Sequence, residues 1–322
     1  MEVEVVESTS AKTQVIRTVV AVCALLNVSA LLAWVLDLGA FHMWFLFVGL
    51  PALVVVASVA IWLAKQPDHD PYLRRAIVAG AIGGLLGTIG YDVFRIPFIL
   101  GGMRLFAPID SYGVLMLNAS ASSQTTGFAG WSYHFTNGIG FGIFYAIIAL
   151  GRKWPWAVLW GLVLETATIL TPFADSYAIR GKWDLIAIAY AAHVAYGIPL
   201  GLVVQKAVTW EPRRPLPVPP WTVLAVLVVA LLGWLRPTGS IPSRPETVVK
   251  DGEFQAQWLR FNPSECGTLT NADDRTYRAE AIVGALEPGG TAQVCNTTVG
   301  AHRVRFDDKP YSGGFIIVDD HA

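Results

Sequence analysis

Six polar or ionisable side chains lie inside otherwise apolar stretches of this 322-residue chain. They are Asp92, Arg95, His134, Asn137, Glu165 and His193. An ionisable group at the centre of a bilayer costs about 2.5–3.5 kcal/mol on insertion scales, so such groups are rare and mark functional sites. We therefore look for the chemistry of this chain first among these six residues.

The spacing of these residues places them in pairs on shared helix faces. Asp92 and Arg95 are three positions apart, as are His134 and Asn137, and residues three apart are neighbours on a helix. The same stretches carry glycines three or four positions apart, which allow helices to approach closely. We expect four helices to bring the polar groups together in a pocket that opens to the non-cytoplasmic side.

Three kinds of chemistry fit this set. In a structural interpretation, Asp92–Arg95 and Glu165–His193 are ion pairs that fix the packing of the helices. In a ligand or ion site, His134, His193, Asp92 and Glu165 converge, and such a donor set suits zinc or iron. The four come singly from four helices, without the His-x₃-His spacing of a strong metal motif. In a third interpretation, Glu165 and His193 handle protons or a small solute, because histidine titrates near neutral pH.

The composition identifies the elements that must position these residues. Apolar residues make up 54% of the chain and charged residues 15%, far below the roughly 25% charged residues of soluble domains. A membrane-spanning helix needs about 20 apolar residues. The sequence predicts seven spans, at 15–36, 41–64, 76–100, 132–151, 155–173, 183–205 and 220–235.

Basic residues predict the orientation of these spans. They gather in alternate loops, at 65–75, 152–153 and 206–214, whereas the 101–131 loop carries Arg104 alone. By the positive-inside rule, residues 1–14 form a cytoplasmic tail, 15–236 the transmembrane domain, 237–245 a linker and 246–322 an extracytoplasmic domain. We thus expect a multi-pass protein of the cell membrane.

The predicted spans also assign a depth to each polar residue. At about 1.5 Å per residue, His134 and Asn137 should lie near the outer surface, and Glu165 and His193 near mid-membrane. Asp92 and Arg95 should lie in the outer half. We expect a row of polar groups from the outer surface to the centre, below a long 101–131 loop.

The last 86 residues are soluble in character. Residues 237–322 carry 12 acidic and 8 basic side chains, and turn signals recur between short apolar runs, which is typical of a small β-sandwich. Cys266 and Cys295 both lie in this region, where an oxidising compartment permits a disulfide. The alternative for this pair is two free thiols.

The order of three segments resembles the second half of a cupredoxin domain. The segments are Leu-Glu-Pro-Gly-Gly-Thr at 286–291, Val-Gly-Ala-His-Arg-Val-Arg-Phe at 299–306 and Gly-Gly-Phe-Ile-Ile-Val at 313–318. The resemblance implies a cupredoxin-like scaffold, the alternative being another small β-sandwich. Type 1 copper is not expected, because the ligand loop reads Asp-Asp-Lys-Pro-Tyr at 307–311 and a blue site needs a thiolate and two imidazoles.

The sequence thus predicts a mainly α fold, a seven-helix transmembrane bundle with a C-terminal extracytoplasmic cupredoxin-like β-sandwich. It favours a non-enzymatic protein that binds a small ligand or ion, or a subunit of a larger membrane complex. A membrane-embedded metal enzyme using the His/carboxylate set, with no catalytic residue or cofactor identified, is one alternative. Another is an assembly protein that docks an extracytoplasmic partner. The expected partners are the lipid bilayer and such proteins; a net charge of −1 gives no indication of nucleic acid binding.

Overall fold

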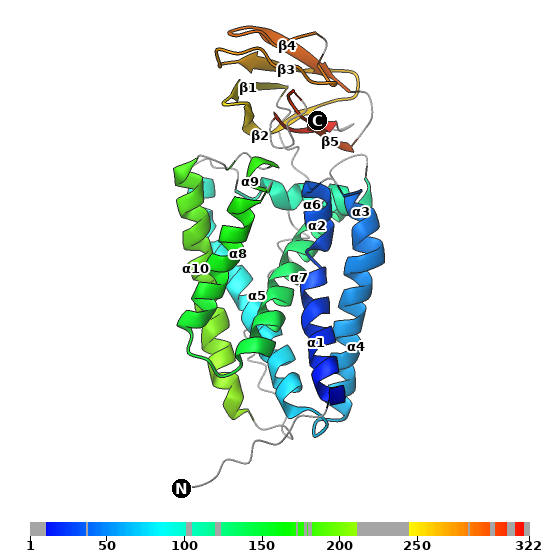
Figure 1. The fold of residues 1–322 in the computed structure, drawn as a ribbon, viewed down its shortest axis with the longest axis vertical. Coiled ribbons are helices and arrows are strands. Elements are labelled where there is room, and N and C mark those ends of the chain that lie inside the picture. Colours follow the sequence, from blue (N-terminus) through cyan, green and yellow to red (C-terminus); the bar gives the residue numbers. More distant parts are fainter. Residues whose placement is uncertain are drawn as a thin grey trace.

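The computed structural model shows a helical bundle with a small β-sheet at one end (Figure 1). It describes residues 11–36, 38–100, 105–119, 124–171, 173–176, 179, 182–210, 245–282, 284–296, 300–307 and 313–318. The helices are α1 (Ala11–Leu26), α2 (Ser29–Val35), α3 (Phe41–Trp44), the π-helix η1 (Phe45–Gly49), α4 (Leu50–Lys65), α5 (Pro71–Leu100), α6 (Ala107–Leu117), α7 (Gln124–Ala149), α8 (Pro155–Leu170), α9 (Phe173–Ser176), α10 (Trp183–Lys206) and the 3-10 helix η2 (Ala207–Thr209).

Six of the seven predicted spans coincide with helices. Three continuous helices, Phe41–Lys65, Pro71–Leu100 and Trp183–Thr209, are long and apolar enough to cross a membrane, and α1 with α2 makes a fourth candidate bent by 48°. Helix α8 is apolar but has 16 residues. The seventh predicted span, 220–235, lies outside the described residues. The chain therefore has the helices of a membrane protein, and the count of seven is not confirmed.

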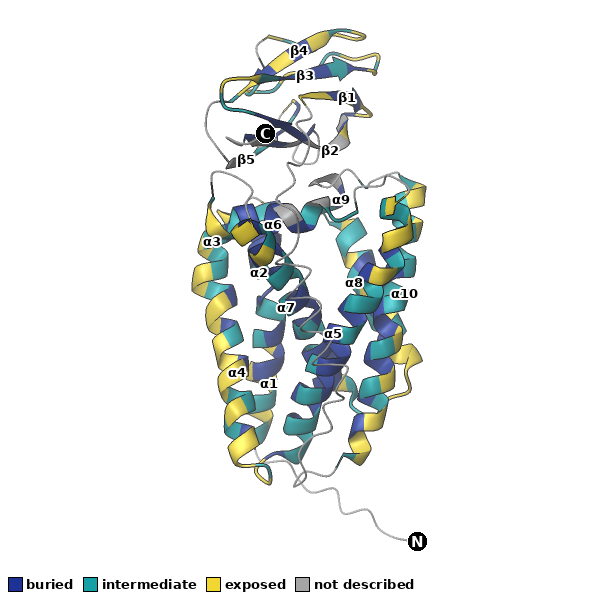
Figure 2. Cartoon of the chain, turned by 180° about the vertical axis from the view of Figure 1, so that it is seen from behind, coloured by how far each residue is buried: buried dark blue, intermediate teal, exposed yellow. Residues whose placement is uncertain are grey.

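Helix α5 is the centre of the bundle, with α7 packed on one side of it and α10 on the other. Buried residues concentrate on α5 and α7, whereas α4 exposes much of its outer side (Figure 2). Glycines permit the central contacts: a Cβ at Gly84 would lie 2.5 Å from the carbonyl oxygen of Gly138, and one at Gly87 would lie 2.6 Å from that of Tyr196. The predicted small-residue faces thus let α5 contact both neighbours through backbone.

The prediction of a long loop at 101–131 is wrong, because most of the described residues in this range are helical. Residues 107–117 form α6, and α7 begins at Gln124, eight positions before the predicted start. The polar run from Gln124 to Thr126 has the composition of a loop. It is helical because α6 and α7 pack closely, so that a Cβ added at Gly113 would overlap the carbonyl oxygen of Thr126.

The C-terminal strands form a six-stranded mixed sheet in the order β4-β3-β1-β2-β6-β5. They are β1 (Glu246–Lys250), β2 (Glu253–Phe261), β3 (Cys266–Asn271), β4 (Thr291–Cys295), β5 (Gly300–Val304) and β6 (Gly313–Val318). The pairs β1–β3 and β2–β6 are parallel. This one small sheet does not confirm a cupredoxin-like sandwich.

The predicted disulfide is present. Cys266 on β3 and Cys295 on β4 face each other in the antiparallel register, with their Cα atoms 4.4 Å apart, and their sulfur atoms are bonded. The bridge therefore joins two neighbouring strands directly. The sheet lies at the end of the bundle where α6 contacts β5 (Figure 1).

Candidate functional site

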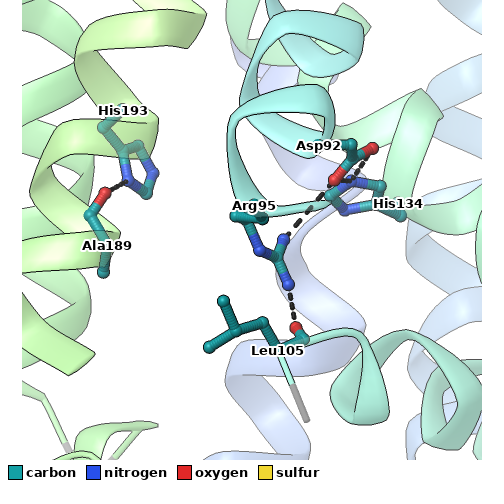
Figure 3. Close-up of polar contacts among 6 residues, drawn as sticks. All are labelled: Asp92, Arg95, Leu105, His134, Ala189 and His193. Carbon is teal, nitrogen blue, oxygen red and sulfur yellow. Dashed lines mark hydrogen bonds and ion pairs between the residues drawn. The ribbon is translucent and has the colours of Figure 1, made fainter. Parts of the chain in front are cut away.

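The carboxylate of Asp92 connects α5 to α7 within the bundle. Nε2 of His134 lies 3.0 and 3.1 Å from the two Asp92 carboxylate oxygens, and Nη1 of Arg95 lies 3.4 Å from Oδ1 (Figure 3). Asp92 and Arg95 are each 7% exposed. The i, i+3 spacing of the sequence therefore forms a buried ion pair, and His134 joins it from the neighbouring helix.

Arg95 is fully engaged by the protein. Its guanidinium lies 4.7 Å from the ring centroids of both Tyr91 and Phe106, and it donates a hydrogen bond to the carbonyl oxygen of Leu105 just before α6. These contacts satisfy the cation with a carboxylate, a carbonyl and two aromatic faces. Arg95 thus holds α5, α6 and Asp92 together.

Glu165 and His193 form the second pair, between α8 and α10. Oε2 of Glu165 lies 3.1 Å from Nδ1 of His193, and the same nitrogen lies 2.9 Å from the carbonyl oxygen of Ala189. The two helices meet closely one turn earlier, where a Cβ at Gly161 would lie 2.6 Å from the His193 carbonyl oxygen. A carbonyl oxygen can only accept, so Nδ1 carries a hydrogen and donates it.

Glu165 has one carboxylate oxygen without a partner. The residue is 3% exposed, and its Oε1 makes no hydrogen bond with any described residue. A buried acceptor left unsatisfied costs about 1–3 kcal/mol, and more when it is charged. An unpaired carboxylate oxygen inside an apolar bundle is therefore expected to meet a donor from outside the chain.

Tyr91 joins the two pairs. Its ring centroid lies 4.9 Å from that of His193 and 6.1 Å from that of His134, while Arg95 lies over its face. Sequence reasoning missed Tyr91, although it directly precedes Asp92 and lies one helical turn before Arg95. We define the Tyr91 cluster as the group formed by this residue and five others: Tyr91, Asp92, Arg95, His134, Glu165 and His193.

Asn137 belongs to a separate network at the break between α1 and α2. Its Oδ1 accepts a 2.7 Å hydrogen bond from Asn27, whose side chain also donates to Thr136 at 3.0 Å. The hydroxyl of Tyr133 donates to the Asn27 carbonyl oxygen at 3.1 Å and accepts from the Leu31 amide at 3.2 Å. These bonds satisfy backbone groups that the bent helix leaves open. Asn27, fully buried and missed in the sequence, therefore has a structural role.

The four proposed metal ligands do not form one group. Asp92 pairs with His134 and Glu165 pairs with His193, with the Tyr91 ring between the two histidines. Within the described ranges, no three His, Cys, Asp or Glu side chains are placed to share an ion. A zinc or iron site at these four residues is thus not supported by their arrangement.

His134 and His193 lie at similar distances from the sheet end of the bundle. Because α7 starts at Gln124, His134 lies about 15 Å along that helix. His193 lies ten residues into α10 and is therefore at a similar depth from the sheet end. His134 thus lies further along its helix than the predicted start at 132 implies, and this position allows it to contact Asp92.

The cluster contains the ion pair Asp92–Arg95 and two hydrogen-bond acceptors, one on Glu165 and one on His193. If Nδ1 of neutral His193 carries the hydrogen, Nε2 has an open lone pair, like Oε1 of Glu165. Such a site suits a donor or a cation. Comparison with protein-family models, with curated proteins and with solved structures finds no match to this chain.

Proposed function

We propose that this chain is a multi-pass membrane protein with seven crossings, a cytoplasmic N-terminus and its β-sheet on the non-cytoplasmic side. The alternating basic loops support this orientation. Helix α10 ends at the end of the bundle remote from the sheet, and β1 begins at the sheet (Figure 1). A crossing at 220–235 would return the chain to the sheet side.

Within this protein, the Tyr91 cluster binds a small cationic hydrogen-bond donor, such as a protonated amine. The observation that carries this proposal is the buried, unpartnered Oε1 of Glu165. Glu165 Oε1 and His193 Nε2 both accept, so the complementary ligand donates, and the carboxylate favours a positive charge. A ligand that paired with Oε1 would remove the cost of leaving that atom unsatisfied.

The rest of the cluster holds this pair in place. The Tyr91 ring packs on the His193 ring in a T-shaped contact, and Arg95, itself held by Asp92, lies over the face of the Tyr91 ring. The acceptors are therefore positioned before a ligand arrives, which lowers the entropic cost of binding.

The β-sheet is proposed to cover the ligand end of the bundle or to dock an extracytoplasmic partner. Support comes from its contact with α6, because α6 follows the Leu105 carbonyl that Arg95 binds. A cupredoxin-like scaffold without type 1 copper stays part of this proposal. It is supported by the Pro288-Gly289-Gly290 turn before β4 and by strands β5 and β6 in the expected order.

The test is ligand-dependent stability of the purified full chain in phosphatidylcholine nanodiscs. Ammonium chloride and methylammonium chloride are compared with potassium chloride at equal ionic strength. A ligand present at 100 times its Kd stabilises the folded state by about 2.7 kcal/mol. We expect one of the two donor cations to raise the unfolding temperature of the wild type. Glu165→Gln should abolish the rise, and Glu280→Gln, at an exposed position of the sheet domain, should keep it.

Two results would contradict the proposal. One is an equal unfolding temperature in all three salts for the wild type. The other is a donor-cation response that persists unchanged in Glu165→Gln. In either case, Glu165 would serve as a structural partner of His193 alone.

A further inference from the structure

A group of exposed basic residues lies at the end of the bundle remote from the sheet (Figure 1). The loop between α7 and α8 packs on the last turn of α10: the Trp154 amide donates to Oε1 of Gln205 at 2.9 Å, and the Gly151 amide donates to the Val204 carbonyl oxygen at 3.3 Å. These contacts bring together three exposed basic residues, Arg152, Lys153 and Lys206, which we name the basic rim.

The two described segments that form the basic rim contain no carboxylate. Residues 150–160 and 200–210 contain neither Asp nor Glu. At the same end of the bundle, by contrast, Arg17 forms two hydrogen bonds to Asp70, at 2.8 and 2.9 Å. The rim is thus a local excess of positive charge.

Two tryptophans lie beside the rim and face outward. Trp154 is 41% exposed and Trp156 is 55% exposed, next to the apolar surface of α8. Tryptophan favours the interface between hydrocarbon and headgroups, so these rings mark the level at which phosphates lie. Basic side chains and tryptophan at one helix–helix junction are the pattern of an anionic lipid site.

We propose that the basic rim binds the headgroup of an anionic phospholipid, with the lipid phosphate between the α7–α8 loop and the end of α10. Arg152, Lys153 and Lys206 pair with its charge, and Trp154 and Trp156 contact its glycerol and upper acyl region. The inference requires that the bundle lies in a bilayer. It does not depend on a ligand at the Tyr91 cluster, which lies toward the opposite end.

The experiment measures lipid binding to the purified full chain in detergent by native mass spectrometry, with dioleoylphosphatidylglycerol and dioleoylphosphatidylcholine as probes. Each Lys or Arg near an anionic surface is worth about fivefold in affinity. Lys153→Ala/Lys206→Ala should therefore weaken phosphatidylglycerol binding by about 25-fold. Lys12→Ala/Lys65→Ala makes the same chemical change at two other exposed lysines and should change that binding by less than about threefold.

Unfolding temperatures in phosphatidylcholine nanodiscs check that both variants are folded. If Lys153→Ala/Lys206→Ala does not fold, the salt dependence of lipid binding to the wild type tests the proposal. Its preference for phosphatidylglycerol must then fall when sodium chloride rises from about 0.05 to 0.5 M, because exposed charges are screened. Equal affinity for the two lipids, equal losses in the two double variants, or displacement of the lipid by millimolar inorganic phosphate would each overturn the proposal.

Discussion

Asp92→Asn removes the carboxylate that contacts both Arg95 and His134. Arg95 is 7% exposed, and its Nη1 lies 3.4 Å from Asp92, so water cannot replace the lost partner. Removing one member of a buried pair costs about 3–5 kcal/mol, because the other charge is left uncompensated. The Leu105 carbonyl and two aromatic rings still contact Arg95, so we expect a loss near the lower value, about 3 kcal/mol.

The assay is the free energy of unfolding of the full chain in bilayer discs, measured for Asp92→Asn, Arg95→Met and the double variant. The double variant removes both charges. Its loss in free energy of unfolding should therefore be smaller than the sum of the two single losses by about 1–3 kcal/mol. An Asp92→Asn loss below about 1 kcal/mol, as at solvent-exposed pairs, would refute the reasoning. Strict additivity of the two single losses would refute it as well.

Three further predictions test the packing and the sheet. Gly84→Ala should destabilise the bundle by about 1–3 kcal/mol, because the added Cβ would lie 2.5 Å from a backbone oxygen. Gly49→Ala should not destabilise it, because the nearest atom to the added Cβ is 3.4 Å away. The unfolding temperatures of the two variants test this difference. Cys266→Ser/Cys295→Ser should cost about 3.5 kcal/mol for a loop of 29 residues, measured by hydrogen exchange of the strands. Burial opposes ionisation of Asp273, but hydrogen bonds from a tyrosine hydroxyl and two backbone amides outweigh it and lower its pKa. This stabilisation is present above the unfolded pKa of about 3.9 and is lost as pH falls through the folded value. Protection of the β1–β2 turn against hydrogen exchange should then decrease, and Asp273→Asn should remove that pH dependence.

Much of the bundle is predictable from the sequence because apolar length and glycine spacing are local properties. The stretches at 76–100 and 183–205 differ from α5 and α10 by a few residues at their ends. The start of α7 was not predictable, because Gln124–Thr126 is polar and its helical state depends on packing against α6. Because the predicted start was eight positions too late, His134 was expected too close to the beginning of its helix.

The candidate site was predictable in its charged members and not in its aromatic ones. Asp92–Arg95 followed from helical spacing, and Glu165–His193 from matching depth. The contact between Asp92 and His134 depends on how α5 and α7 cross, which glycine spacing permits without fixing the register. Tyr91 carries no signal in an apolar stretch, because it is neutral and its role arises from partners distant in sequence. Asn27 is as polar as Asn137, but its role also arises from partners distant in sequence.

The free oxygen of Glu165 is the basis of the proposed binding function, and infrared difference spectroscopy observes that carboxyl group directly. The full chain in nanodiscs is exposed to ammonium chloride or methylammonium chloride and then to potassium chloride. We predict a change in a carboxylate band with at least one of the two donor cations that is present in the wild type and in Glu280→Gln but missing in Glu165→Gln. An unchanged spectrum in the wild type, or the same change in Glu165→Gln, would contradict the account.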